Sequence, residues 1–79
     1  MDESKNLTFS TALLLLKEGK HLRRAGWNGK GQYVALQTPD EHSKMRLPYA
    51  YLVNVTGQPV PWVPSQGDLF AEDWQTVTV

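Results

Sequence analysis

Two tryptophan residues flanked by polar side chains are the best candidates for ligand chemistry in this sequence. Trp27 lies in the segment Gly-Trp-Asn-Gly, and Trp62 lies three residues before Ser65. The face of an indole ring stacks on nucleobases, and each stacked base contributes about 1–3 kcal/mol. In so short a chain aromatic residues also form the core, and core packing is favoured for Trp74, which opens the last strand. For Trp27, ligand contact and core packing are equally open.

The charged residues gather in two segments, although the formal net charge of the chain is zero. Residues 17–30 hold five cations and one anion, whereas residues 68–73 hold three anions and no cation. Cationic side chains bind phosphates, and carboxylates accept hydrogen bonds from hydroxyl or amino groups. One segment is therefore suited to phosphates and the other to sugars or amines. Two solvated charged faces that bind nothing are the alternative interpretation.

The candidate binding residues divide by their chemistry. Those for the phosphates are Arg23, Arg24 and Lys30. Those that would read the sugars and the base are Asn28, Ser65, Gln66 and Asp68. Adjacent residues on a strand point to opposite faces, so the two arginines are not expected to contribute equally. Arg24 is favoured, because it lies nearer the Gly-Trp turn.

The sequence shows no residue pattern typical of an enzyme, so no catalytic residue is predicted. His42 and Ser43 lie in a polar segment without a carboxylate placed to orient the histidine, as a nucleophilic triad requires. Glu72 and Asp73 are adjacent and point apart, which suits acid–base catalysis poorly. A glycine-rich phosphate motif of the Walker or dinucleotide-fold type is also lacking.

Length, charge and cysteine content exclude several other classes. Seventy-nine residues make one domain, 1–79, whose thin core favours support from a homo-oligomer. With no cysteine and two histidines, neither a disulfide nor a metal site is expected, and no cofactor is predicted. A net charge of zero disfavours duplex nucleic acid as a partner. The longest apolar run, Ala12–Leu16, is far shorter than the ~20 residues of a membrane span, and no export signal is visible, so a cytoplasmic protein is expected.

An amphipathic helix is predicted near the amino terminus. Thr8 is suited to cap its first turn, and Gly19 to end it. The residues that recur at helical spacing and face the core are Phe9, Ala12, Leu13 and Leu16. Leu14 and Leu15 widen the apolar face, which fits either a subunit interface or a deeper core.

The rest of the chain predicts a small antiparallel sheet. The expected strands are Lys20–Ala25, Gln32–Gln37, Tyr49–Val55, Pro59–Val63 and Trp74–Val79. Its prolines confine the fourth of these to a sheet edge. Ser65 is expected to cap a short helical turn that ends by Glu72, with Asp68 as the capping partner. The fold class is therefore α+β: one amphipathic N-terminal helix packed on a small antiparallel sheet, with a short helical turn near the carboxyl terminus.

Two segments, in this order, resemble a known family. The first is the predicted helix followed by Arg-Ala-Gly-Trp-Asn-Gly-Lys at residues 24–30. The second is Trp-Val-Pro-Ser-Gln-Gly-Asp-Leu-Phe-Ala-Glu-Asp-Trp at residues 62–74. Together they resemble the second Thoeris anti-defence family of small phage and bacterial proteins, over nearly the whole chain. Gly67 departs from the family pattern, in which Thr or another side chain is common, and Ser10-Thr11 replace the usual Gly-Glu.

The resemblance implies a protein that sequesters a signal without cleaving it. Proteins of that family bind the cyclic ADP-ribose isomer made by TIR-domain enzymes of Thoeris defence, so that the downstream effector is not activated. The resemblance also implies a homotetramer and, for some members, binding of cyclic dinucleotides at separate sites. An adenine, two riboses and a pyrophosphate require a stacking ring, cations and polar acceptors, which the candidate residues supply. A phosphodiesterase-type enzyme that degrades such a signal, and a structural or protein-interaction module, are the alternative interpretations.

Overall fold

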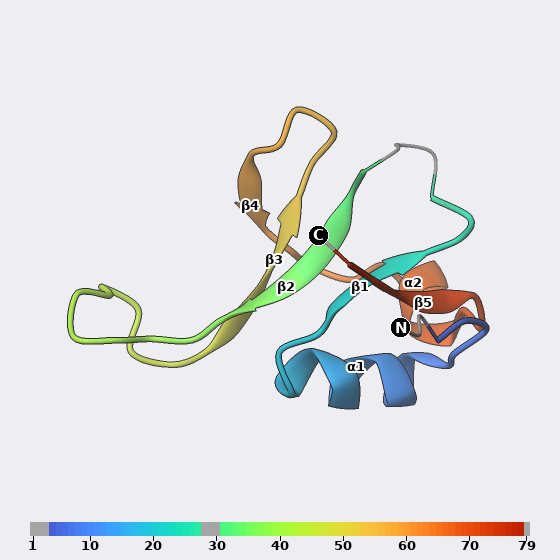
Figure 1. Ribbon diagram of the computed structural model, residues 1–79, viewed down its shortest axis with the longest axis horizontal. Helices are drawn as coiled ribbons and strands as arrows, with labels where there is room; N and C mark the ends of the chain where they lie inside the picture. Colours follow the sequence, from blue (N-terminus) through green and yellow to red (C-terminus); the bar gives the residue numbers. More distant parts are fainter. Residues whose placement is uncertain (1–3, 28–30, 79) are drawn as a thin grey trace.

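The computed structural model describes residues 4–27 and 31–78, and its first element is helix α1 (Phe9–Lys17) (Figure 1). The helix begins where the Thr8 hydroxyl accepts a hydrogen bond from the Thr11 N–H at 3.4 Å. After the last turn, Gly19 takes a φ of 96°, which glycine adopts without steric cost. The predicted helix, with its cap at Thr8 and its end at Gly19, is confirmed.

Five antiparallel strands form one sheet in the order β4-β3-β2-β1-β5 (Figure 1). Their bounds are β1 (His21–Arg24), β2 (Tyr33–Gln37), β3 (Tyr49–Val53), β4 (Pro59–Pro61) and β5 (Trp74–Val77). Helix α2 (Gln66–Phe70) follows β4 in the chain and begins, as predicted, at a Ser65 cap. The α+β class and the edge position of β4 are both confirmed.

The strands are shorter than predicted, and the end of β3 shows why. Asn54 folds its side chain back onto the backbone, so that its Oδ1 accepts hydrogen bonds from Thr56 N–H at 3.0 Å and from Gln58 N–H at 3.0 Å. Val55 therefore lies in a turn instead of the strand. Local competition by an Asn side chain ends the strand two residues before the predicted position.

The outer edge of β5 is covered by the segment that precedes α1. Leu7 and Trp74 exchange backbone hydrogen bonds of 2.8 and 3.1 Å, and Thr76 N–H donates to the Ser4 carbonyl at 2.9 Å. At the opposite edge, Pro59 and Pro61 lack the N–H groups that an added strand would need. Both sheet edges are thus closed to strand addition. Within residues 4–27 and 31–78, no helix has the length and apolar character needed to cross a membrane.

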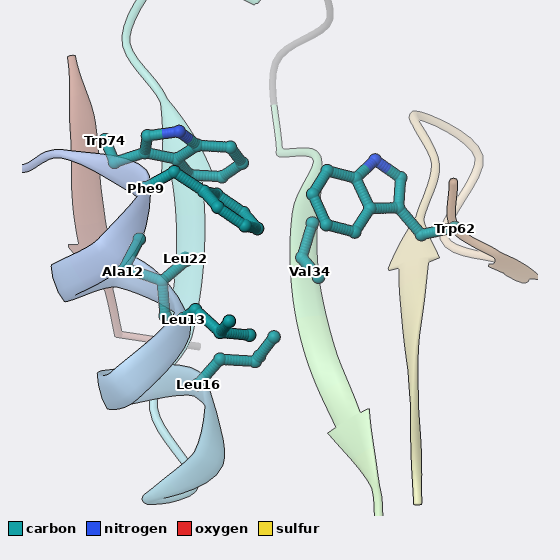
Figure 2. Close-up of a pocket in the computed structure, with 8 residues that line it drawn as sticks. All are labelled: Phe9, Ala12, Leu13, Leu16, Leu22, Val34, Trp62 and Trp74. Carbon is teal, nitrogen blue, oxygen red and sulfur yellow. The ribbon is translucent and has the colours of Figure 1, made fainter. Parts of the chain in front are cut away.

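The core lies between α1 and one face of the sheet, here called the helix face (Figure 2). Its fully buried side chains, each at most 3% exposed, are Ala12, Leu16, Leu22, Val34 and Trp74. Leu13 is 37% exposed and Leu14 is 59% exposed, so part of the wide apolar face of α1 remains outside this core. The core is therefore thin, as the chain length predicts.

The opposite side of the sheet, here called the tyrosine face, carries the three tyrosines of the chain, Tyr33, Tyr49 and Tyr51. Side chains alternate along each strand, and the pairs Leu22–Val34 and Val34–Leu52 lie on the helix face. Residues one position away, among them Arg23, consequently point to the tyrosine face. There the His21 ring stacks on Tyr33 at a centroid distance of 4.9 Å.

Candidate functional site

Arg24 joins the two charged segments that lie far apart in the sequence. Its position opposite Trp74 in the β1–β5 pair brings its side chain to the loop before β5. Its Nε donates to Asp73 Oδ1 at 2.9 Å, and its Nη1 donates to Asp68 Oδ1 at 3.0 Å. The charge separation along the sequence is therefore absent in space around Arg24, where one cation lies between two anions.

Asp73 holds the backbone of the turn that follows β1. Its Oδ2 accepts a hydrogen bond from the Gly26 N–H at 2.9 Å, and its carbonyl accepts one from the Ala25 N–H at 3.0 Å. A Cβ at position 26 would lie 2.9 Å from Asp73 Oδ2, closer than real contacts allow. Glycine at position 26 therefore permits this close approach of the carboxylate to the turn.

Asp68 connects the start of α2 to the same turn. Its Oδ2 accepts from the Ser65 N–H at 2.9 Å, and its own N–H donates to Ser65 Oγ at 3.0 Å, which completes a capping box. Its Oδ1 accepts a second hydrogen bond, from Trp27 Nε1 at 3.3 Å. We call Arg24, Trp27, Asp68 and Asp73 the Arg24 network.

The ionic partners keep the Arg24 network charged. The hydrogen bond from Arg24 lowers the pKa of Asp73, against the smaller opposite effect of burial. For Asp68 the largest single effect is burial, which raises the pKa, but the hydrogen bonds from Ser65, Arg24 and Trp27 together outweigh it and the pKa is lowered. The pKa of Arg24 is raised, chiefly by its hydrogen bond to Asp73. All three groups are ionised at neutral pH.

The aromatic residues form a row next to this network. Trp74 is 1% exposed, and its Nε1 donates to the Asp68 carbonyl at 2.9 Å. Trp27 meets its ring edge-on at 5.4 Å, and Trp62 does so at 5.9 Å. Phe9 lies between, 5.5 Å from Trp74 and 6.2 Å from Trp62. The core role predicted for Trp74 is confirmed, whereas Trp27 and Trp62 are half-buried at the edge of the core.

Trp62 lines two hollows of the surface. In the first, the rings of Phe9, Trp62 and Trp74 lie at one end of a narrow apolar recess under α1, with Leu13 and Leu16 at the other end (Figure 2). The second hollow is an open and mainly apolar groove. The remaining lining residues of that groove are Met45, Tyr49, Ala50 and Pro61. A planar ligand can therefore reach Trp62 from the groove.

The structure brings together only some of the predicted binding residues. Those that converge are Arg24, Trp27, Ser65 and Asp68. Gln66 is exposed as the first residue of α2, and Trp62 joins the group through Trp74. Arg23 points to the tyrosine face, on the opposite side of the sheet from Arg24, as the alternation along a strand predicts. Asn28 and Lys30 lie outside the described residues.

Sequence reasoning missed the roles of two residues of this region. Asp73 was considered as a catalytic acid and set aside, yet it pairs with Arg24 and caps the turn at Gly26. Phe9 was assigned to the core stripe alone, although its ring also contacts Trp62. The available signal was the position of Gly26 and Asp73, each of which lies inside one of the two segments that carry the family resemblance.

Comparison with known proteins gives a consistent result over the whole structure. Residues 7–77 match the family described as the Thoeris anti-defense 2-like domain. A protein named Thoeris anti-defense 2, from Bacillus phage SP01, is 34% identical over 85 residues. The alignment covers 91% of this chain and 96% of that protein. The family match, over residues 7–77, includes the Arg24 network and the aromatic row.

Proposed function

The chain belongs to the Thoeris anti-defense 2-like family, and from this premise we propose that it counters Thoeris defence by sequestering a cyclic nucleotide signal. The ligand class that we propose is a cyclic ADP-ribose isomer made by TIR-domain enzymes. The protein holds this molecule without cleaving it, so that no covalent step is involved. By mass action, each signal molecule bound to the protein is unavailable to the effector.

The observation that carries this proposal is the half-buried indole of Trp27 next to an array of ionised and polar groups. The indole belongs to the Arg24 network, in which its Nε1 donates to Asp68 Oδ1 at 3.3 Å. An adenine stacked on an indole gains dispersion and hydrophobic free energy, and the neighbouring polar groups can fix its orientation. The exposed Gln66 amide and Ser65 at the start of α2 provide further polar groups for ribose hydroxyls.

Arg24 retains donors for the pyrophosphate in spite of its two ion pairs. A guanidinium has five N–H groups, and the described contacts to the aspartates use those on Nε and Nη1. Its side chain is 23% exposed, and position 67, beside Nη1, carries no side chain to cover it. Because two anions lie close to one cation here, we expect Lys30 to contribute charge to the same phosphates.

The assembly that we propose is a homo-oligomer, most simply a homotetramer in the cytoplasm of the infected cell. A 79-residue chain buries little surface alone, and Leu14, Leu47 and Val63 are more than half exposed. Light scattering at working concentration is expected to give a mass several times 8.9 kDa. A mass of one chain would contradict the oligomer without affecting the ligand proposal.

The decisive experiment is mass spectrometry of small molecules released by denaturing the protein after purification from cells with an active TIR cyclase. We expect an intact cyclic ADP-ribose isomer in amounts comparable to the protein. Recovery of a linear product would favour the phosphodiesterase alternative. Calorimetric titration with cyclic dinucleotides tests the second ligand class, and no heat with either class would favour an interaction module.

The variant Trp27→Ala tests whether this residue contacts the ligand. We expect at least a tenfold loss of affinity for the cyclic ADP-ribose isomer, because one stacked base contributes about 1–3 kcal/mol. Tyr51→Ala, on the tyrosine face, is the matched control and should bind as the parent does. Unchanged affinity of Trp27→Ala, with cooperative unfolding retained, would assign Trp27 to the core alone.

A further inference from the structure

Trp27 is held by two contacts that come from distant parts of the chain. Its ring meets Trp74 edge-on at 5.4 Å and 77°, and its Nε1–H donates to Asp68 Oδ1 at 3.3 Å. An edge-to-face contact is compatible with a range of ring positions, whereas a hydrogen bond fixes the direction of the indole N–H. The orientation of the exposed part of the ring therefore depends on Asp68.

Asp68 can orient another residue because it is itself fixed at every polar atom. Its two carboxylate oxygens accept from Ser65 N–H at 2.9 Å and from Arg24 Nη1 at 3.0 Å. Its N–H donates to Ser65 Oγ, and its carbonyl accepts from Trp74 Nε1. The residue is only 8% exposed. The carboxylate thus lies in a rigid frame formed by α2, β1 and β5.

The number of these contacts leaves Asp68 little capacity for a ligand. An ionised carboxylate has about four lone-pair sites. Ser65, Arg24 and Trp27 occupy three of them. We infer that Asp68 is a positioning residue, which acts on a ligand by aiming Trp27 and does not itself read the sugars or the base. The inference rests on the proposed function only where it takes Trp27 as the stacking surface.

Asp73 offers a matched control within the same network. Asp73 carries the same charge as Asp68 and accepts a hydrogen bond from the same arginine, from Arg24 Nε at 2.9 Å. Its second oxygen binds the Gly26 N–H, a backbone group, instead of the indole. Asp73→Asn therefore changes the charge and the turn, while the hydrogen bond to the Trp27 ring is kept.

The first test reads the indole N–H directly by ¹H–¹⁵N NMR of the ligand-free protein, in which the three tryptophans give three indole signals. In Asp68→Asn we expect the Trp27 indole proton to move upfield and to exchange faster with water, because a neutral amide oxygen is a weaker acceptor than the carboxylate. The Trp62 signal, from an indole that is not a donor to Asp68, should stay near its place. A Trp27 signal that is unchanged, or that moves equally in Asp73→Asn, would overturn the inference.

The second test is a double-mutant cycle on affinity for the cyclic ADP-ribose isomer, measured by calorimetry. Trp27→Phe should lower affinity about tenfold, the loss of one hydrogen bond to a charged group, and Asp68→Asn should lower it by up to the same factor, because a neutral amide oxygen accepts this bond less strongly. Because both act on the same contact, the double variant should lose no more than Trp27→Phe alone, about tenfold and not a hundredfold. Additive losses would show that Asp68 touches the ligand itself and would overturn the inference.

Asp68→Asn also weakens the α2 cap, so a variant that keeps Asp68 protects the test from a folding failure. Trp27→Phe leaves the capping box and an aromatic face but lacks the indole donor. If Asp68→Asn does not fold, undiminished affinity of Trp27→Phe overturns the inference. If the parent protein binds no cyclic ADP-ribose isomer, the proposed function fails, while the NMR test of Asp68 still gives an answer.

Discussion

The helix face and the tyrosine face of the sheet differ in how their aromatic residues are held. On the helix face, Trp74 is 1% exposed, donates to the Asp68 carbonyl and is flanked by two further indoles. On the tyrosine face, His21 stacks on Tyr33, and Tyr49 is 36% exposed. One face is fixed by hydrogen bonds as well as by packing, whereas the other is held chiefly by the strands beneath it.

This difference shows where the fold and the proposed site depend on the same residues. On the helix face, Asp68 caps α2, pairs with Arg24 and binds the indole of Trp27. A change there alters both stability and the stacking surface. On the tyrosine face, Ala35 and Gln75 are buried, at 2% and 8% exposed, but the more exposed side chains can change with little effect on the fold of a single chain.

The largest expected effect is a loss of stability when the buried Trp74 of the helix face is replaced. Trp74→Ala should lower the free energy of unfolding by about 3–5 kcal/mol, because it removes a fully buried indole and leaves a cavity. Tyr51→Ala, on the tyrosine face, should cost about 1 kcal/mol or less. Urea unfolding followed by far-ultraviolet circular dichroism measures both. Equal losses would show that the tyrosine face is packed like a core.

A smaller effect is expected at the turn held by Asp73. A Cβ at position 26 would lie 2.9 Å from Asp73 Oδ2, so Gly26→Ala must displace the carboxylate from the turn or from Arg24. We expect a loss of about 1–3 kcal/mol, the cost of breaking a hydrogen bond to a charged group. The thermal midpoint reports this loss. An unchanged midpoint would mean that the Asp73 contacts contribute nothing to stability.

Acid should destabilise the folded chain through Asp68 and Asp73, the two carboxylates that pair with Arg24 on the helix face. The pKa values of Asp68 and Asp73 are both lowered in the folded chain, so these carboxylates stabilise it above the unfolded pKa of about 3.9. Their contribution is lost as the pH falls through the folded pKa values, with uptake of up to about one proton per carboxylate on unfolding. Stability measured between pH 7 and pH 2 tests this. The double variant with asparagine at both positions should show a shallower slope, and an identical slope would contradict the assignment.

The smallest effect is expected at Gly67, on the other side of Arg24. A Cβ there would lie 3.6 Å from Ser65 Oγ and 3.9 Å from Arg24 Nη1, which are ordinary contacts. Gly67→Ala should therefore stabilise the chain by about 0.5–1 kcal/mol, because alanine restricts the unfolded state and favours the helix. Thermal unfolding is again the measurement. A destabilised variant would show that space beside Arg24 is needed by the folded chain itself.

The elements themselves were determined by local sequence. The helical stripe that starts at Phe9, the Thr8 cap and the stop at Gly19 predict α1, and the Ser65–Asp68 pair predicts the start of α2. Each of these signals acts within four residues, where the chain has few alternatives. The proline content of Pro59–Pro61 likewise placed β4 at an edge, because proline cannot donate to a second neighbour. The ends of the strands were less predictable, since a single side chain such as that of Asn54 can redirect them.

The candidate site was determined by the tertiary structure. Arg24 and Asp68 are 44 positions apart in the chain, and Arg24 and Asp73 are 49 positions apart. The sequence predicted two separate charged regions, because a charge carries no information about which distant opposite charge will meet it. The antiparallel pairing of β1 with β5 brings these residues together, and burial of Asp68 against Trp74 then makes the hydrogen bonds of its carboxylate necessary. Local periodicity fixes the elements, but only the packing of the strands decides which polar groups lose water and must find each other.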